Sequence, residues 1–152
     1  MNLKIRKAGI DDTKLVTDMA AKLLSELRER TVFSSDLFDI CEELLSKEGN
    51  LYTVFLAFKE EECIGMVTIH GVTSLYATGS MGIIQELYVL PNLRSEGTGD
   101  QLIHAAKEHG YKCGWTNIEV GAPHAEKWSR TVSFYKRKDF KEIGPRLRYD
   151  LK

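Results

Sequence analysis

The stretch LYVLPNLRSEGTGDQLIHAAKEHG, residues 87–110, reads as an apolar strand, a short polar loop and an amphipathic helix. Gly97 and Gly99 stand where the helix begins, although glycine is a poor helix former. The first N–H groups of a helix lack backbone partners and carry partial positive charge, and glycines there let a bulky anion approach them. Two glycines fit a phosphate or pyrophosphate cradle, and they fit a tight turn without a ligand equally well.

Two common phosphate-binding loops do not fit this stretch. The spacing G-x-G-x-x-G would need a third glycine where the sequence has Leu102. The sequence also lacks Gly-Lys-Ser/Thr, with which a Walker-type loop ends. A nucleotide-binding domain of either kind is therefore disfavoured, and the anion site itself stays open.

The composition is that of a globular protein in water, with 43% hydrophobic and 28% charged residues in 152. This length suits one domain, and we expect a single domain over residues 1–152. The net charge of -1 argues against a nucleic-acid partner, because duplex-binding proteins are usually basic. No apolar run approaches membrane-spanning length, so we expect no membrane partner either.

The cysteines and the N-terminus point to the cytoplasm. Cys41, Cys63 and Cys113 are odd in number and lack C-x-x-C spacing, so we expect free thiols in a reducing compartment. The start MNLKIRKAGIDD has scattered charges and no long apolar stretch, unlike a signal peptide. The sequence has no H-E-x-x-H, Cys/His cluster or acidic triad, so we expect no metal site.

Hydrophobic periodicity predicts a mixed α/β arrangement around one sheet. Helices are expected after Asp12, after the SSD of residues 34–36, at 97–110 and at 124–138. Strands are expected at 3–8, 51–58, 63–72, 81–90, 116–122, 140–144 and 146–152. The strand–helix–strand unit between Ile83 and Val120 should form a crossover with parallel strands.

Three motifs, in their order along the chain, resemble the GNAT N-acetyltransferase superfamily. LRSEGTGDQLI resembles its R-x-x-G-x-G pyrophosphate loop through Arg94, Gly97 and Gly99. IQELYVLP resembles its fourth strand, and VSFYKRKDF resembles the end of its FY-x-x-x-GF helix. A group of small, mostly uncharacterised bacterial members looks more similar still. The resemblance implies one mixed, mostly antiparallel sheet flanked by helices, with splayed central strands.

The resemblance implies acetyl-CoA as co-substrate. The loop would bind its pyrophosphate, and the fourth strand would pair with the pantetheine arm as with an added strand. A backbone N–H near Val89 would face the acetyl oxygen. The residues expected to bind the cofactor are Leu87, Tyr88, Val89, Arg94, Ser95, Glu96, Gly97, Thr98, Gly99 and Asp100.

Acetyl transfer needs a neutral amine and a proton for the departing thiolate. Tyr135 matches the general acid of the family, although its spacing from Trp128 and Val132 also fits plain packing on an amphipathic helix. Glu86 stands on an otherwise apolar strand, where many family members carry a general base. A residue that only binds a cation or faces solvent fits Glu86 as well, and His70 is the alternative base.

Two positions depart from the family pattern. The asparagine that often opens the last helix and contacts the pantetheine is here Trp128. The glycine of the GF motif is Asp139, which would have to adopt a left-handed conformation.

The resemblance implies direct transfer of acetyl to a primary amine in a ternary complex. We expect the acceptor to be a small amine or a peptide N-terminus, bound beside the first two helices. A non-catalytic acyl-CoA binding or sensing module on the same fold is the alternative. Family members are often dimers, so a homodimer is among the expectations.

Overall fold

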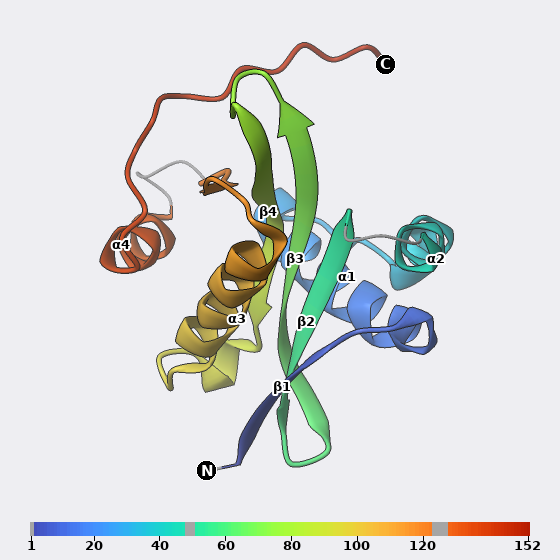
Figure 1. The fold of residues 1–152 in the computed structure, drawn as a ribbon. Coiled ribbons are helices and arrows are strands. Elements are labelled where there is room, and N and C mark those ends of the chain that lie inside the picture. Colours follow the sequence, from blue (N-terminus) through green and yellow to red (C-terminus); the bar gives the residue numbers. More distant parts are fainter. Residues whose placement is uncertain (1, 48–50, 123–127) are drawn as a thin grey trace.

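The computed structural model describes residues 2–47, 51–122 and 128–152 (Figure 1). The chain first forms β1, α1 and α2, then three strands, then α3, β5 and α4. The strands are β1 Leu3–Lys7, β2 Tyr52–Lys59, β3 Glu62–Ser74, β4 Gly79–Val89 and β5 Ile118–Val120. The helices are α1 Thr13–Arg28, α2 Phe38–Ser46, α3 Thr98–Cys113 and α4 Ser129–Arg137. The expected start of the last helix at His124 lies outside the described residues.

The strands form one sheet in chain order, β1-β2-β3-β4-β5. Each pair from β1 to β4 is antiparallel, and β5 alone runs parallel to its neighbour β4. The mixed, mostly antiparallel sheet and the parallel β4–α3–β5 crossover are therefore confirmed. β3 and β4 extend further than expected, so their connection shortens to residues 75–78.

Two layers of apolar side chains pack on opposite faces of this sheet, with α3 on one face and α1 and α2 on the other (Figure 1). The α3 face is built on Ala57, Val67, Ile69, Ile84, Leu102, Ile103 and Ala106. The α1/α2 face is built on Val16, Met19, Val54, Leu56, Met66 and Tyr88. Because strand residues alternate between faces, each central strand contributes to both layers.

A bulge in β4 changes this alternation at one residue. Thr68 of β3 pairs with Glu86, but the next residue, Ile69, pairs with Ile84, so Gln85 has no partner in the ladder. Ile84 belongs to the α3 face. Without the bulge, Glu86 would share that face with Ile84, because residues two apart point the same way. The extra residue instead places Glu86 on the α1/α2 face.

The pairing between β4 and β5 covers only the first part of β4. Gly82, Ile83 and Ile84 pair with the three residues of β5, and the ladder stops there. β4 continues to Val89 along β3 alone. The two strands therefore separate beyond Ile84, as the splayed central strands of the prediction require, and one edge of β4 stays unpaired among the described residues.

The predicted final strands at 140–144 and 146–152 are wrong. Residues 138–152 have no helix or strand, and the chain leads outward from α4 to its C-terminus (Figure 1). Residues 146–152 alternate apolar and polar as a strand does, but a strand also needs a neighbouring edge to bond with. Leu147, Tyr149 and Leu151 are 94%, 87% and 91% exposed.

The described residues contain no helix long and apolar enough to cross a membrane. Cys41, Cys63 and Cys113 are free thiols, as predicted. Burial raises the pKa of Cys41 to about 11 and also raises the pKa of Cys63. These two thiols are therefore poor nucleophiles at neutral pH.

Candidate active site

The loop between β4 and α3 leaves the N-terminus of α3 open. Gly97 caps the helix in a left-handed conformation (φ 91°), and its N–H groups receive no side-chain cap. A Cβ atom at Gly97 would meet no heavy atom within 4 Å, so protein does not fill the space beside it. The 16-residue helix directs its partial positive charge there. This end of α3 is thus accessible to an anion.

Thr98, the first residue of α3, has a buried hydroxyl without a partner. The residue is 2% exposed, and its Oγ1 is the one buried side-chain polar atom without a hydrogen bond in the described part of the chain. Leaving a buried polar group unpaired costs about 1–3 kcal/mol. A phosphate oxygen at the start of α3 would fit both this hydroxyl and the uncapped N–H groups.

Gly99 meets a different requirement from Gly97. A Cβ atom at Gly99 would lie 3.2 and 3.3 Å from two ring carbons of Phe134 on α4. That is closer than side chains normally approach, so the missing Cβ allows α4 to pack on the first turn of α3. The sequence argument gave one reason for both glycines, whereas the structure gives each its own.

Arg94 binds protein groups on the β4 side of the loop. Its Nε donates a 2.8 Å hydrogen bond to the carbonyl of Val89, and its Nη2 lies 2.9 Å from the carboxylate of Glu26 on α1. The guanidinium also lies over the ring of Tyr88, 5.3 Å from its centroid. Arg94 therefore ties the loop to α1 and to the end of β4.

The unpaired edge of β4 presents peptide groups beside this loop. The N–H of Leu90 donates to the carbonyl of Ile64 on β3, so Leu90 points its peptide groups toward β3. Peptide groups alternate in direction along an antiparallel strand. Leu87 and Val89 therefore point theirs away from β3, toward the side where β5 has separated, and Tyr88 points back at β3.

Glu86 is held in place by one side chain of the neighbouring strand. The hydroxyl of Thr68 donates a 2.6 Å hydrogen bond to Glu86 Oε1 and accepts a 3.0 Å bond from the Glu86 N–H. Thr68 itself is fully buried, and Glu86 is half-buried. Burial, and secondarily the charge of Glu86, raises the pKa of Tyr52. The carboxylate is thus a fixed negative charge on the α1/α2 face.

A cavity of about 140 Å³ opens beside Glu86 between the sheet and helices α1 and α2. Apolar side chains form its walls, and the polar groups lie mostly on the strands beneath. The residues of this Glu86 cavity are Val16, Thr17, Ala20, Leu24, Leu37, Ile40, Cys41, Leu44, Tyr52, Met66, Thr68 and Glu86. The cavity is a partly open site for a small molecule next to a carboxylate.

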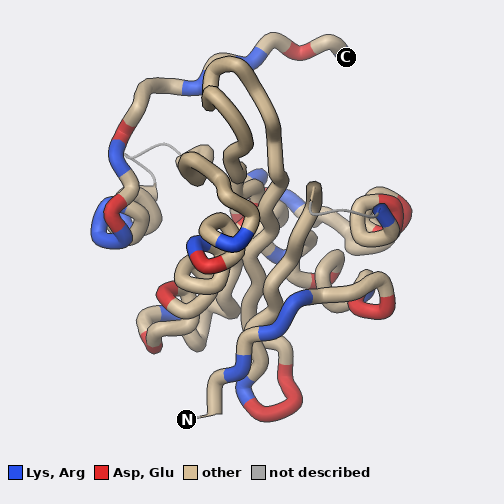
Figure 2. Tube along the Cα trace, in the orientation of Figure 1, with Lys and Arg blue, Asp and Glu red and all other residues tan. Residues whose placement is uncertain are grey.

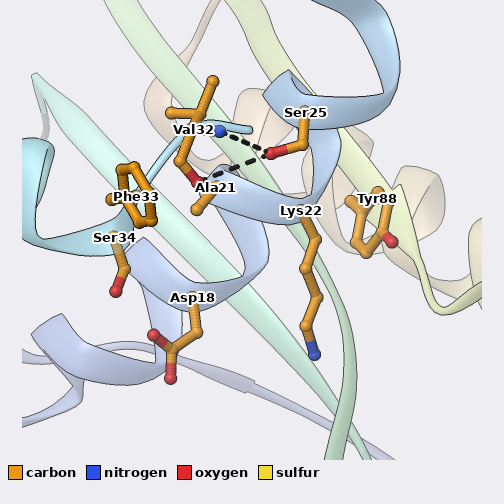
Figure 3. A pocket seen from close by; sticks show the side chains of 8 residues that line it. All are labelled: Asp18, Ala21, Lys22, Ser25, Val32, Phe33, Ser34 and Tyr88. Atoms are coloured by element: carbon orange, nitrogen blue, oxygen red, sulfur yellow. Dashed lines mark hydrogen bonds between the residues drawn. The ribbon is translucent and has the colours of Figure 1, made fainter. Parts of the chain in front are cut away.

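A larger hollow of about 470 Å³ lies along a different side of α1 (Figure 3). It is lined by Asp18, Ala21, Lys22, Ser25, Val32, Phe33, Ser34 and Tyr88. The hydroxyl of Ser25 accepts a hydrogen bond from the Val32 N–H at 2.9 Å, which holds the chain after α1 against the helix. Glu86 and Tyr135 do not line this hollow.

Tyr135 lies on the opposite face of the sheet from Glu86. It is 7% exposed within the α3-face cluster and contacts the rings of Phe134 and Phe140, whose centroids lie 5.5 and 5.6 Å away. Burial raises the pKa of Tyr135 to about 12. The hydroxyl is therefore protonated at neutral pH. Leu87 and Val89, whose peptide groups face the gap, belong to the same cluster.

Residues 50–142 match the acetyltransferase (GNAT) domain family, and this range is more than half of the chain. The chain belongs to the GNAT family. It is an N-acetyltransferase, and GNAT acetyltransferases use acetyl-CoA.

Among curated relatives, this GNAT protein is 27% identical over 143 residues to the aminoalkylphosphonate N-acetyltransferase of Salmonella typhimurium, covering 91% of this chain and 85% of the relative. It is 26% identical over 141 residues to an uncharacterised N-acetyltransferase of Bacillus subtilis, covering 92% and 91%. The crystal structure of an aminoglycoside acetyltransferase from an uncultured soil metagenomic sample, in complex with trehalose, has the same fold. Its TM-score is 0.82 at 24% identity, over 99% of this chain and 97% of that one.

One departure from the GNAT motifs is explained by the backbone. Asp139, which replaces the glycine of the GF motif, has a φ of 69° just after α4, the left-handed conformation that the sequence predicted. Trp128 stands directly before the first residue of α4. Aspartate reaches the left-handed region at lower cost than most residues with a side chain, so Asp139 can take the place of the glycine after α4.

Sequence reasoning missed two cations beside the loop between β4 and α3 of this GNAT protein. Arg130, in the first turn of α4, donates a 2.9 Å hydrogen bond from Nη2 to the hydroxyl of Ser95. Lys138, just after α4, forms a 2.9 Å ion pair with Asp100 in the first turn of α3. Figure 2 shows basic residues on α4 beside α3. No motif marks these residues, because only the packing of α4 on Gly99 brings them to the loop.

Proposed function

We propose that this enzyme transfers the acetyl group of acetyl-CoA to a primary amine by direct attack within a ternary complex. The observation that carries the proposal is the open N-terminus of α3 beside the unpaired edge of β4. Gly97 leaves space at the helix end, and the buried Thr98 hydroxyl there lacks a partner. Phosphates suit the first site, and an extended amide chain suits the second.

The binding residues fall into two groups. Residues of the loop, Ser95 to Asp100, would hold the pyrophosphate with their N–H groups and the Thr98 hydroxyl, and Arg130 would add positive charge. The peptide groups of Leu87 and Val89 would bond to the pantetheine arm. Arg94 would act mainly through the shape of the loop, because Glu26 and the Val89 carbonyl already occupy its donors. Bound there, acetyl-CoA supplies the activated acetyl group.

Glu86 is assigned as the general base. The amine nitrogen must lose a proton as it attacks the acetyl carbon, and the Glu86 carboxylate would take that proton directly or through one water molecule. The Val89 N–H faces the gap between β4 and β5 and would stabilise the negative charge that develops on the acetyl oxygen. The C–S bond then breaks, and the electron pair leaves with sulfur.

Tyr135 would stabilise this sulfur with a hydrogen bond. Burial raises the pKa of Tyr135 to about 12. Complete proton transfer from such a phenol to a thiolate with a pKa of about 8.5 would cost about 5 kcal/mol. A hydrogen bond from the phenol avoids this cost, and the thiol gains its proton when it reaches water.

Thermal unfolding with acetyl-CoA, CoA, ATP and NAD in parallel tests the cofactor. A ligand at a hundredfold excess over its Kd adds about 2.7 kcal/mol to stability. For this chain length that corresponds to a shift of about 5–10 °C. Stabilisation by acetyl-CoA and CoA alone supports the site, and no shift with either rejects it.

Thiol release with a panel of amines separates catalysis from binding. Glu86→Gln and Tyr135→Phe should each lower kcat at least tenfold while the thermal shift with acetyl-CoA is kept. Tyr111→Phe is the matched control, because Tyr111 is 79% exposed on α3. Cofactor binding without thiol release from any amine would instead favour a non-catalytic acyl-CoA binding module.

A further inference from the structure

The chemistry of the Glu86 cavity is informative about the acceptor. Glu86 is the one charged residue in its lining, and eight of its twelve lining residues are apolar or a thiol. No lysine, arginine or histidine lines it in the described part of the chain. The cavity therefore offers one negative charge within apolar walls.

The hydroxyl groups of the cavity are mostly engaged with protein. Thr17 Oγ1 donates to the carbonyl of Thr13 at 2.9 Å. Thr68 Oγ1 donates to Glu86 and accepts from its N–H. The Tyr52 hydroxyl also interacts with Thr68. The second oxygen of the Glu86 carboxylate then remains as the main polar contact for a ligand. It suffices for one amino group, but several hydroxyls of a sugar would be buried there without partners.

We propose that the acceptor is a compact primary amine with an aliphatic substituent and no anionic group. The ammonium group is attracted to Glu86, and the hydrocarbon part lies between α1 and α2 against side chains such as Leu24 and Leu44. A volume of 140 Å³ corresponds to roughly five water molecules, which suits amines of about three to six carbon atoms. This assignment rests on the proposed function.

An anionic amine would be disfavoured in this cavity. A phosphonate would lie near the Glu86 charge with no cation in the cavity to offset it. The nearby cations are engaged elsewhere, since Arg94 is paired with Glu26 and Lys22 lines the hollow on the other side of α1. The acceptor preference of this enzyme should thus differ from the one that the name of its Salmonella relative states.

The test measures thiol release at saturating acetyl-CoA with n-butylamine, 2-aminoethylphosphonate, sisomicin and glycylglycine amide. We expect kcat/KM for butylamine to exceed the other values at least tenfold, with an optimum between propylamine and hexylamine. An equal or larger kcat/KM for the phosphonate, the aminoglycoside or the peptide would overturn the substrate class and leave the proposed function intact. No release with any amine, the alkylamines included, would count against both.

One substitution at the rim of the cavity should change this preference. Ile40 lines the cavity and is 59% exposed, so Ile40→Lys can be accommodated without burying a charge. It should lower kcat/KM for butylamine at least fivefold and raise the ratio of phosphonate to butylamine turnover. Phe38→Lys on the same helix is the matched control, because Phe38 does not line the cavity. Equal effects of both variants would contradict binding in the Glu86 cavity.

Discussion

The Thr68 hydroxyl and the Glu86 carboxylate are joined by a 2.6 Å hydrogen bond across β3 and β4. The same hydroxyl accepts the Glu86 N–H, so one buried side chain fixes both the backbone and the carboxylate of the assigned base. The pair also lies beside the β4 bulge, since Thr68 is the last β3 residue in register before it.

Thr68→Val keeps the branched shape and removes both hydrogen bonds. A hydrogen bond to a charged group contributes about 1.5–3 kcal/mol, so we expect a loss of about 2 kcal/mol in urea unfolding and at least a tenfold loss of kcat/KM. Thr73→Val is the control, because Thr73 bonds to Ser80 on the same hairpin but in an exposed position. The control should lose less than about 0.5 kcal/mol. Equal losses of stability and of kcat/KM in the two variants would show that the Thr68–Glu86 contact contributes no more than an exposed hydrogen bond.

Gly97→Ala should weaken acetyl-CoA binding more than it weakens folding. An alanine at φ 91° is strained by about 1–2 kcal/mol, and its Cβ would enter the space assigned to phosphate. We expect at least a tenfold rise in the Kd for acetyl-CoA by calorimetry. Gly114→Ala is the matched control, since Gly114 has a left-handed φ of 72° in open space at the other end of α3. It should cost similar stability and leave the Kd unchanged.

Gly99→Ala should destabilise the docking of α4 on α3, because the new Cβ would lie 3.2 Å from the Phe134 ring. We expect a loss of about 1–3 kcal/mol in chemical unfolding. Phe134→Leu removes the ring, so the double variant should lose less than the sum of the two single losses by at least 0.5 kcal/mol. If the two single losses simply add in the double variant, contact with Phe134 is not the reason for glycine at position 99.

Because of His109, the free energy of unfolding should decrease as the pH is lowered below neutral. Burial, with smaller contributions from Lys7 and Lys112, lowers its pKa in the folded state. Folding therefore favours the neutral ring. The stability that His109 contributes is fully present above the unfolded-state pKa of about 6.5, and this stability is lost as the pH falls below that value. The ring contacts Thr53 and Trp115.

Unfolding free energies at pH 7.5 and 5.5 measure this effect. The wild type should lose more stability between the two values than His109→Gln does. The exposed His104 provides a control on the same helix, and His104→Gln should follow the wild type. A wild type and a His109 variant with identical pH dependence would exclude the proposed contribution.

The sequence predicted well those features that depend on local pattern. Alternation marked the long strands, and Gly97 marked the start of α3, where the structure shows a left-handed φ that favours glycine. The features it missed depend on neighbours distant in the chain. Phe134 explains Gly99, and Arg130 reaches Ser95, only after α4 has packed on α3.

The final strands were predicted wrongly for a related reason. Alternating side chains give residues 146–152 the local pattern of a strand, but pairing requires an edge that the single chain does not bring to them. The Glu86 cavity likewise combines two helices and three strands, so its apolar walls have no signature in any one segment.

The unpaired Gln85 separates the direction of Glu86 from that of Ile84. The side chain of Gln85 is exposed, so almost any replacement at this position should be tolerated. Deleting Gln85 would remove the bulge and still leave Glu86 opposite Thr68, because Ile84 and Glu86 would then be consecutive residues of a regular ladder. A slip of the strand that takes Gln85 into the ladder would instead turn Glu86 toward the α3 face, away from the cavity. The direction of the assigned base therefore depends on the register of two strands, and changes that shift this register matter more than the identity of the extra residue.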